Sequence, residues 1–244
     1  LLYLTMNPLL EDFNTAPFSK ISSTDYKPAI KKAIEICKQE IESIISNPET
    51  PSFQNTTEAL EFTGQKLGRI TSIFFNLNSA ETSEAIQKIA QEISPWLSEF
   101  KNDMILNSAL FKKVKSVYNT RGVLNLDSEQ TMLLEKQYKG FSRNGANLNN
   151  EDKEKLRKID TELSKLSLQF GENVLADGNA FELHIIHEKD LKGLPDGAKE
   201  AASLLAKNRN KEGWLITLDY PSYIPFVTYA ENRELRKKLS IAFG

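Results

Sequence analysis

The sequence predicts a mainly α-helical protein, a bundle-like body of long antiparallel helices with a small two- or three-stranded β element in the C-terminal third. Two observations lead to this prediction. Over most of the chain, apolar residues recur every three or four positions, which is the spacing of one face of an α-helix. After about residue 179 the period changes to two, which is the spacing of one face of a β-strand.

The first predicted helix covers residues 24–46. Its apolar face consists of Ile30, Ala33, Ile34, Cys37, Ile41, Ile44 and Ile45. Because Cys37 belongs to this face, we expect its thiol to be buried and to behave as a small apolar side chain. As the single cysteine of the chain it has no internal disulfide partner, so nothing indicates an oxidising compartment.

The second and third helices each contain residues that usually interrupt helices. The second is expected to begin at Thr56 or Thr57, because either side chain can cap it. Gly64 and Gly68 lie inside its pattern, which indicates close packing against a neighbouring helix. The third contains Pro95, which removes a backbone hydrogen bond and is expected to kink or split the helix.

Two shorter helices are predicted at residues 108–119 and 127–142, and a long one at about 150–176, which Gly178 is placed to end. The apolar positions of the long helix are Leu156, Ile159, Leu163, Leu166, Phe170 and Val174. This spacing of three and four is also that of a coiled-coil dimer, but it lasts only about three heptads. Since neighbouring helices are present to pack on it, we expect a helix inside the bundle.

Strands are predicted at residues 180–187 and 213–219, with a helix between them. The first strand holds the two histidines of the chain, His184 and His187. Because they are three residues apart, an extended strand directs them to opposite faces, away from a common metal ion. Glu188 follows both histidines, whereas helical zinc signatures place a glutamate between them. We therefore predict ordinary strand residues, with no catalytic residue and no metal ligand in this chain.

Three residues after the second strand are candidates for substrate binding: Tyr220, Ser222 and Tyr223. They open a predicted helix, where backbone N–H groups and phenols are able to contact a peptide. The alternative, which the sequence favours, is a structural turn between strand and helix.

Charge and hydropathy set limits on partners. A net charge of −2 and a pI near 5.9 do not indicate a nucleic acid partner. No apolar run approaches the roughly 20 residues that span a bilayer, and the first residues lack the features of a secretory signal. We expect a cytoplasmic protein without a membrane partner. Met6 opens the phrase MNPLLEDF, so residues 1–5 are expected to lie upstream of the natural start.

Several phrases, taken in order, resemble the amino-terminal part of the thimet oligopeptidase and oligopeptidase A family of zinc metallopeptidases, and most closely its bacterial peptidyl-dipeptidase branch. These phrases are NPLLEDF with TAPF, DYKPAI, NTTEALEFTGQKLGRITSIFFNLNSAET, ISPWLSEFKNDMILNSALFKKVKSVY, FSRNGANL, LKGLPDGAKEAA and TLDYPSYIPFVTYAENRELRKKL. Each is weak alone, but together they extend from about residue 7 to the end of the sequence.

The resemblance implies a helical body divided by a deep channel, with short peptides as substrates and a dipeptide released from the substrate's C-terminus. It also implies zinc in the full-length enzyme, held by a His-Glu-x-x-His helix and a further glutamate. No residue here matches those ligands, so this chain alone is expected to bind no zinc and to be inactive.

The resemblance further divides the chain into two parts. Residues 1–178 are expected to form a helical amino-terminal domain, and residues 179–244 a β-containing segment that leads to the missing C-terminal catalytic domain of the same chain. That domain is the expected partner, and the surface it would cover is expected to let the fragment self-associate. The alternatives are an oligopeptidase A-like endopeptidase and a free-standing helical interaction module without activity.

Overall fold

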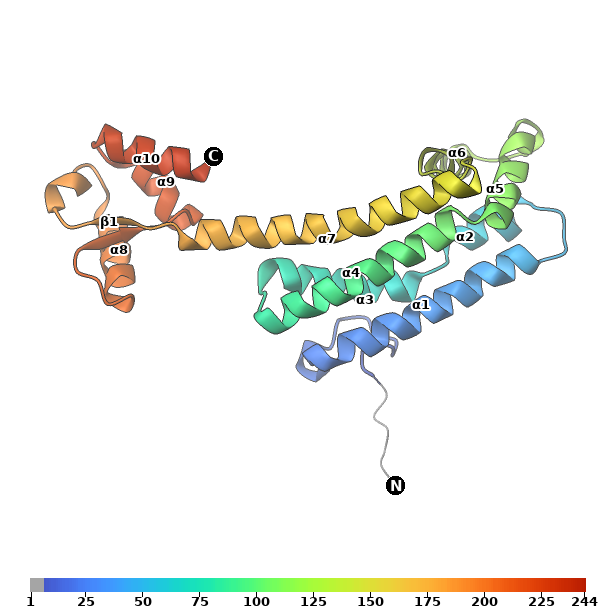
Figure 1. The fold of residues 1–244 in the computed structure, drawn as a ribbon, viewed down its shortest axis with the longest axis horizontal. Helices are drawn as coiled ribbons and strands as arrows, with labels where there is room; N and C mark the ends of the chain where they lie inside the picture. The colour runs from blue at the N-terminus through green and yellow to red at the C-terminus, as the bar shows by residue number, and fades with distance from the viewer. Residues whose placement is uncertain (1–6) are drawn as a thin grey trace, which may run out of the picture. The chain divides into compact units, whose positions relative to one another are not determined.

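The structure, a computed structural model, describes residues 7–244 and confirms the predicted mainly helical fold with a small β element (Figure 1). The expected start at Met6 lies outside the described residues. By its internal contacts the chain divides into two units, the first ending at Leu168 and the second covering Gln169–Gly244. This division lies inside one helix, α7 (Asn150–Ala180), whereas the domain boundary predicted from the sequence is at 178/179.

The first unit is built from helices. They are η1 (Phe18–Lys20), α1 (Ser23–Ser46), η2 (Phe53–Glu58), α2 (Ala59–Glu61), α3 (Gln65–Ala80), α4 (Glu84–Ile105), α5 (Ser108–Thr120), η3 (Arg121–Val123), α6 (Ser128–Arg143) and the first part of α7 (Asn150–Ala180). Helix α1 packs against α3, α4 and α5, and α5 packs against α6. The predicted apolar face of α1 supplies much of the core, including Ile30, Ala33 and the buried thiol of Cys37.

The predicted second helix is interrupted at Gly64. The segment before it is a π-helix, capped by the Ser52 side chain, which accepts a hydrogen bond from the Asn55 N–H at 3.1 Å. The prediction of a cap at Thr56 or Thr57 was therefore wrong, and both residues lie buried within η2. Gly64 has a φ of +72°, which ends α2 and starts α3.

Close helix packing does not explain both glycines of this segment. A Cβ on Gly64 would lie 2.9 Å from Sγ of Cys37, so α1 does approach closely there. Nothing lies within 4 Å of the Cβ position of Gly68, so its packing explanation was wrong. The backbone N–H of Gly64 donates to Oε2 of Glu40 at 2.8 Å, which fixes the break against α1.

Helix α4 continues through Pro95 from Glu84 to Ile105, so Pro95 does not split it. Helix α7 continues through Gly178 to Ala180, so that glycine does not end it.

The expectation that α7 lies inside a bundle was wrong for most of its length. Its single buried residue among those described is Lys153. Five of its apolar side chains are between 50% and 71% exposed: Ile159, Leu163, Leu166, Phe170 and Val174, here called the α7 stripe. A regular apolar repeat shows that a helix has an apolar face, but it does not show that a neighbour covers that face.

The second unit combines two short strands with helices. Its elements are the last part of α7, β1 (Leu183–Ile185), η4 (Glu188–Leu191), α8 (Asp196–Asn208), β2 (Trp214–Ile216), α9 (Tyr220–Tyr229) and α10 (Arg233–Phe243). The strands are antiparallel, with Leu183 opposite Ile216 and Ile185 opposite Trp214. Leu183, Ile185 and Ile216 enter a core with Phe226 of α9 and Leu239 of α10, and α8 packs against β2.

Candidate functional site

The two histidines do not form a site in the described structure. His184 lies in β1 between the buried Leu183 and Ile185 and is exposed, as the predicted alternation requires. Its Nε2 donates a hydrogen bond to the carbonyl oxygen of Glu212 at 2.6 Å. The strand is shorter than predicted, because it ends at Ile185 and His187 instead precedes η4. The argument from alternating faces therefore applies to His184 and does not reach His187.

Next to His184, Glu182 is an ion-pair centre rather than a free carboxylate. Its carboxylate accepts hydrogen bonds from both Lys211 and Arg209. These two bonds hold the pKa of Glu182 below its ordinary value, and the bond from Lys211 has the larger effect. These contacts tie the start of β1 to the segment that follows α8.

The candidate residues Tyr220, Ser222 and Tyr223 form the first turn of α9, as predicted. The ring of Tyr223 stacks on Phe243 of α10 with 4.2 Å between centroids, and Tyr220 meets the same ring edge-to-face at 5.8 Å. Tyr220 is nevertheless 68% exposed.

Ser222 has a structural role in this turn. Its Oγ accepts a hydrogen bond from the N–H of Thr217 at 3.0 Å, and its own N–H donates to the carbonyl oxygen of Asp219 at 2.8 Å. The hydroxyl of Thr217 donates to Oδ2 of Asp219 at 2.9 Å. These bonds connect the end of β2 to the start of α9, so Ser222 is already engaged within the turn.

A pocket of about 310 Å³ lies beside this turn, in the second unit. Its walls are mainly apolar and come from α8 and β2, including Ala198, Ala202 and Leu215, with Asp219 and Ser222 also lining it. Of the three candidate residues, Ser222 alone lines this pocket, so the structure does not bring them together around one cavity.

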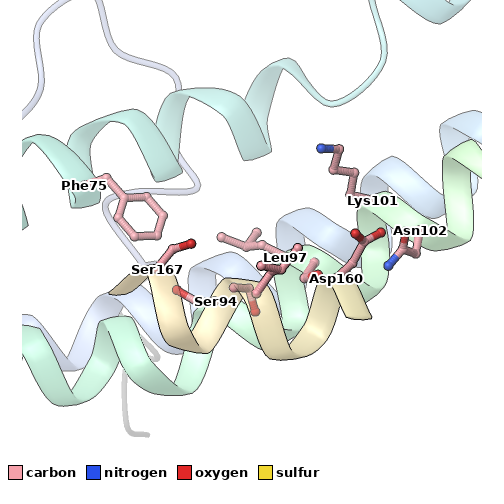
Figure 2. A pocket seen from close by; sticks show the side chains of 10 residues that line it. Phe75, Ser94, Leu97, Lys101, Asn102, Asp160 and Ser167 are labelled. Carbon is pink, nitrogen blue, oxygen red and sulfur yellow. The ribbon is translucent and has the colours of Figure 1, made fainter. Parts of the chain in front are cut away.

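A second pocket, of about 380 Å³, lies in the first unit between α3, α4 and α7 (Figure 2). It is lined by Phe75, Ser94, Leu97, Ser98, Lys101, Asn102, Asp160, Leu163, Ser164 and Ser167, and is called the α4–α7 pocket below. Apolar side chains and hydroxyl groups share its walls with one cation and one anion.

The α4–α7 pocket is not predicted by the sequence. Ser94, Ser98 and Lys101 recur at intervals of four and three on α4, and Asp160, Ser164 and Ser167 do so on α7. This polar repeat is the one feature of the sequence that could have indicated the pocket. It is not specific, because a helix face in contact with solvent has the same pattern. Only the tertiary structure shows that these two faces line one pocket.

Among residues 7–244, no three His, Cys, Asp or Glu side chains are grouped so as to hold a metal ion. Within the same residues, no helix combines the length and the apolar character needed to cross a membrane.

Comparison with known proteins gives the class. Over nearly its whole length the chain is a homologue of the peptidases of the oligopeptidase A and dipeptidyl carboxypeptidase family, and it corresponds to the amino-terminal portion of these proteins. No family model matches the chain.

Individual relatives show the same extent of similarity. The chain is 34% identical to dipeptidyl carboxypeptidase of Escherichia coli over 244 residues, which covers 98% of the chain and 36% of that enzyme. It is 30% identical over 238 residues to oligopeptidase A of the same organism, covering 98% of the chain and 35% of the relative. Thimet-like oligopeptidase of Dictyostelium discoideum is 28% identical over 228 residues. The chain thus spans about a third of the length of the curated relatives it matches.

Proposed function

We propose that this chain is the non-catalytic, amino-terminal portion of a zinc-dependent peptidyl-dipeptidase that removes C-terminal dipeptides from short peptides, and that it forms one wall of the substrate channel. One observation carries the proposal: 98% of the chain aligns with about a third of a dipeptidyl carboxypeptidase, and residues 7–244 hold no group of metal ligands. Hydrolysis of a peptide bond needs an activated water and a general base, which the proposal attributes to the remaining two thirds.

The test compares this chain with the longer protein that contains it. An N-blocked tripeptide with a free C-terminal carboxylate is the substrate, and release of the dipeptide is measured with and without a zinc chelator. The longer protein is expected to release the dipeptide in a chelator-sensitive way, and this chain is expected to release none. Zinc-dependent release by the purified chain would contradict the proposal.

The second candidate is an endopeptidase, favoured by the similarity to oligopeptidase A at 30% identity. A blocked and C-terminally amidated pentapeptide separates the two. A peptidyl-dipeptidase needs the free carboxylate and leaves this substrate intact, whereas an endopeptidase cleaves it internally. If neither substrate is cleaved by the longer protein, the remaining alternative is a helical interaction module.

The exposed α7 stripe supports the proposal that another part of the same longer protein docks on this chain. Its five apolar side chains lie along one helix with half or more of each exposed. Ile159, Leu163 and Leu166 belong to the first unit, and exposed apolar side chains grouped on one helix face are typical of an interface. Because the relatives are about three times as long as this chain, we propose that the remaining polypeptide covers the stripe.

Tyr220 is the proposed contact to a peptide, with Tyr223 supporting its ring through the shared packing on Phe243. In the longer protein, Tyr220→Ala is expected to raise KM for the tripeptide by several-fold and to leave kcat nearly unchanged, because a uniform binding contact is lost. Thr228→Ala, at another residue of α9, is the matched control. An unchanged KM for Tyr220→Ala would show that these tyrosines only pack the turn.

A further inference from the structure

Two buried side-chain oxygens of the first unit have no hydrogen-bond partner among residues 7–244 and lie at one contact between helices. They are Oγ1 of Thr57 and Oε1 of Gln137. Thr57 belongs to the π-helix η2 and is 0% exposed, and Gln137 belongs to α6. The two residues touch, because Nε2 of Gln137 donates a hydrogen bond to the carbonyl oxygen of Thr57 at 2.9 Å.

The geometry of the π-helix explains why the hydroxyl of Thr57 lacks a partner. Inside an α-helix a threonine hydroxyl commonly donates to a backbone carbonyl three or four residues earlier. Thr71 of α3 does so, at 2.9 Å from the carbonyl oxygen of Leu67. In η2 the carbonyl oxygen of Gln54 accepts from the N–H of Ala59, five residues later, and this wider turn leaves Thr57 without such a bond.

The side chains next to this contact are apolar. Phe53 of η2 forms a small core with Val117 of α5 and Leu134, which lies one turn before Gln137 on α6. Apolar side chains offer no hydrogen bonds, so each of the two oxygens loses its hydration on folding without a replacement from the described residues. Buried oxygens in this situation are usually satisfied by a bound water molecule.

We propose that one ordered water molecule binds between Thr57 and Gln137 and joins η2 to α6. The water donates one hydrogen bond to Oε1 of Gln137, which as an amide oxygen only accepts. It forms the other with the hydroxyl of Thr57, which is able to donate or accept. Together with the direct bond from Nε2 to the carbonyl oxygen of Thr57, the water satisfies both groups of the Gln137 amide.

The chemistry of the contact favours water over other ligands. A hard metal cation needs several oxygen ligands, whereas the amide nitrogen of Gln137 already donates to the carbonyl oxygen of Thr57. A larger organic ligand needs an open cavity, and both unpartnered oxygens are buried. The remaining alternative is a direct hydrogen bond between the two side-chain oxygens, which the experiment separates from a bound water.

The test is a high-resolution crystal structure of this chain. One water is expected within about 3.2 Å of both Oγ1 of Thr57 and Oε1 of Gln137. Thr57→Val keeps the shape of the side chain without its hydroxyl and is expected to lose this water. Thr71→Val removes a hydroxyl that bonds to its own helix, and as the matched control it is expected to keep the water. A parent chain without the water, or with the two oxygens directly bonded, would overturn the proposal, as would a water that persists in Thr57→Val.

A double-mutant cycle tests in solution whether the two oxygens share a partner. Thr57→Val alone is expected to lower the equilibrium constant for folding about tenfold, because Oε1 of Gln137 is left buried without a donor. In a chain that already carries Gln137→Met, the same change is expected to have almost no effect, because the bridge is already lost. An equal effect in both backgrounds would contradict a shared water. The inference goes beyond the proposed peptidase function, and its test needs no catalytic activity.

Discussion

The ammonium group of Lys153 donates a hydrogen bond to the carbonyl oxygen of Leu106 at 2.9 Å. Leu106 follows the last residue of α4, where backbone carbonyls lack helical partners. The same ammonium donates to Oγ of Ser108, the first residue of α5, also at 2.9 Å. Lys153 is 7% exposed, so one buried cation of α7 ties together the end of one helix and the start of the next.

Replacing this cation is expected to destabilise the first unit. Lys153→Met leaves the carbonyl of Leu106 without its charged donor, at a cost of about 1.5–3 kcal/mol in the free energy of unfolding. Urea unfolding followed by the fluorescence of Trp96, with Trp214 replaced by phenylalanine, reports on this unit alone. Lys158→Met, at an exposed position of α7, is the control and is expected to change stability by less than about 0.5 kcal/mol. Equal stability of the two variants would contradict a structural role for Lys153.

The two glycines near the start of α3 are expected to respond in opposite directions to alanine. At Gly64 the φ of +72° and the contact of 2.9 Å to Sγ of Cys37 make a Cβ unfavourable, by about 1–2 kcal/mol. At Gly68 the Cβ enters open space inside a helix, so alanine is expected to stabilise the unit by about 0.5–1 kcal/mol. The same Trp96 unfolding curve measures both. A loss of stability on Gly68→Ala would restore the packing explanation for that glycine.

The α7 stripe is expected to make this chain self-associate at high concentration, because no described residue covers it fully. Introducing Leu166→Glu and Phe170→Glu together is expected to return the chain to a monomer in equilibrium sedimentation, because charge at the stripe opposes burial. Val123→Glu changes an 87% exposed apolar residue outside the stripe and serves as the control. A parent chain that stays monomeric at high concentration would argue against a docking face on α7.

The buried thiol of Cys37 is expected to make stability fall at alkaline pH. Burial, and then the nearby carboxylate of Glu40, raise the pKa of Cys37 to about 11. The unfolded thiol loses its proton near its ordinary value of 9.0 while the folded one keeps it, so the free energy of unfolding decreases as pH rises from about 9 to about 11. Unfolding curves of the parent chain and Cys37→Ala across this window isolate the effect, since lysines and tyrosines titrate in both. If the free energy of unfolding changed with pH in the same way in the parent chain and in Cys37→Ala, the pKa of the Cys37 thiol would not be raised by folding.

The candidate sites show where sequence reasoning stops. Tyr220, Ser222 and Tyr223 were found because they follow a strand and open a helix, and the structure places them in the first turn of α9. The structure also shows that the hydroxyl of Ser222 accepts a hydrogen bond from the N–H of Thr217 within the turn. The sequence does not predict this bond, because it depends on the distance between the two residues in the folded chain. Asn102 gives no sequence signal at all, because its burial depends on which helix lies beside α4.

The sequence by itself determined most of the helices, the positions of the two strands and which face of each element is apolar. A period of 3.6 in α1 or of two around His184 is a local property, because side-chain direction follows from the backbone of a few consecutive residues. Only the tertiary structure decided that the α7 stripe stays exposed, that Gly64 breaks a helix against Cys37, and that Lys101 and Asp160 share a pocket. Each of these depends on contacts between residues far apart in the chain, and a repeat within one segment carries no information about the surface that meets it.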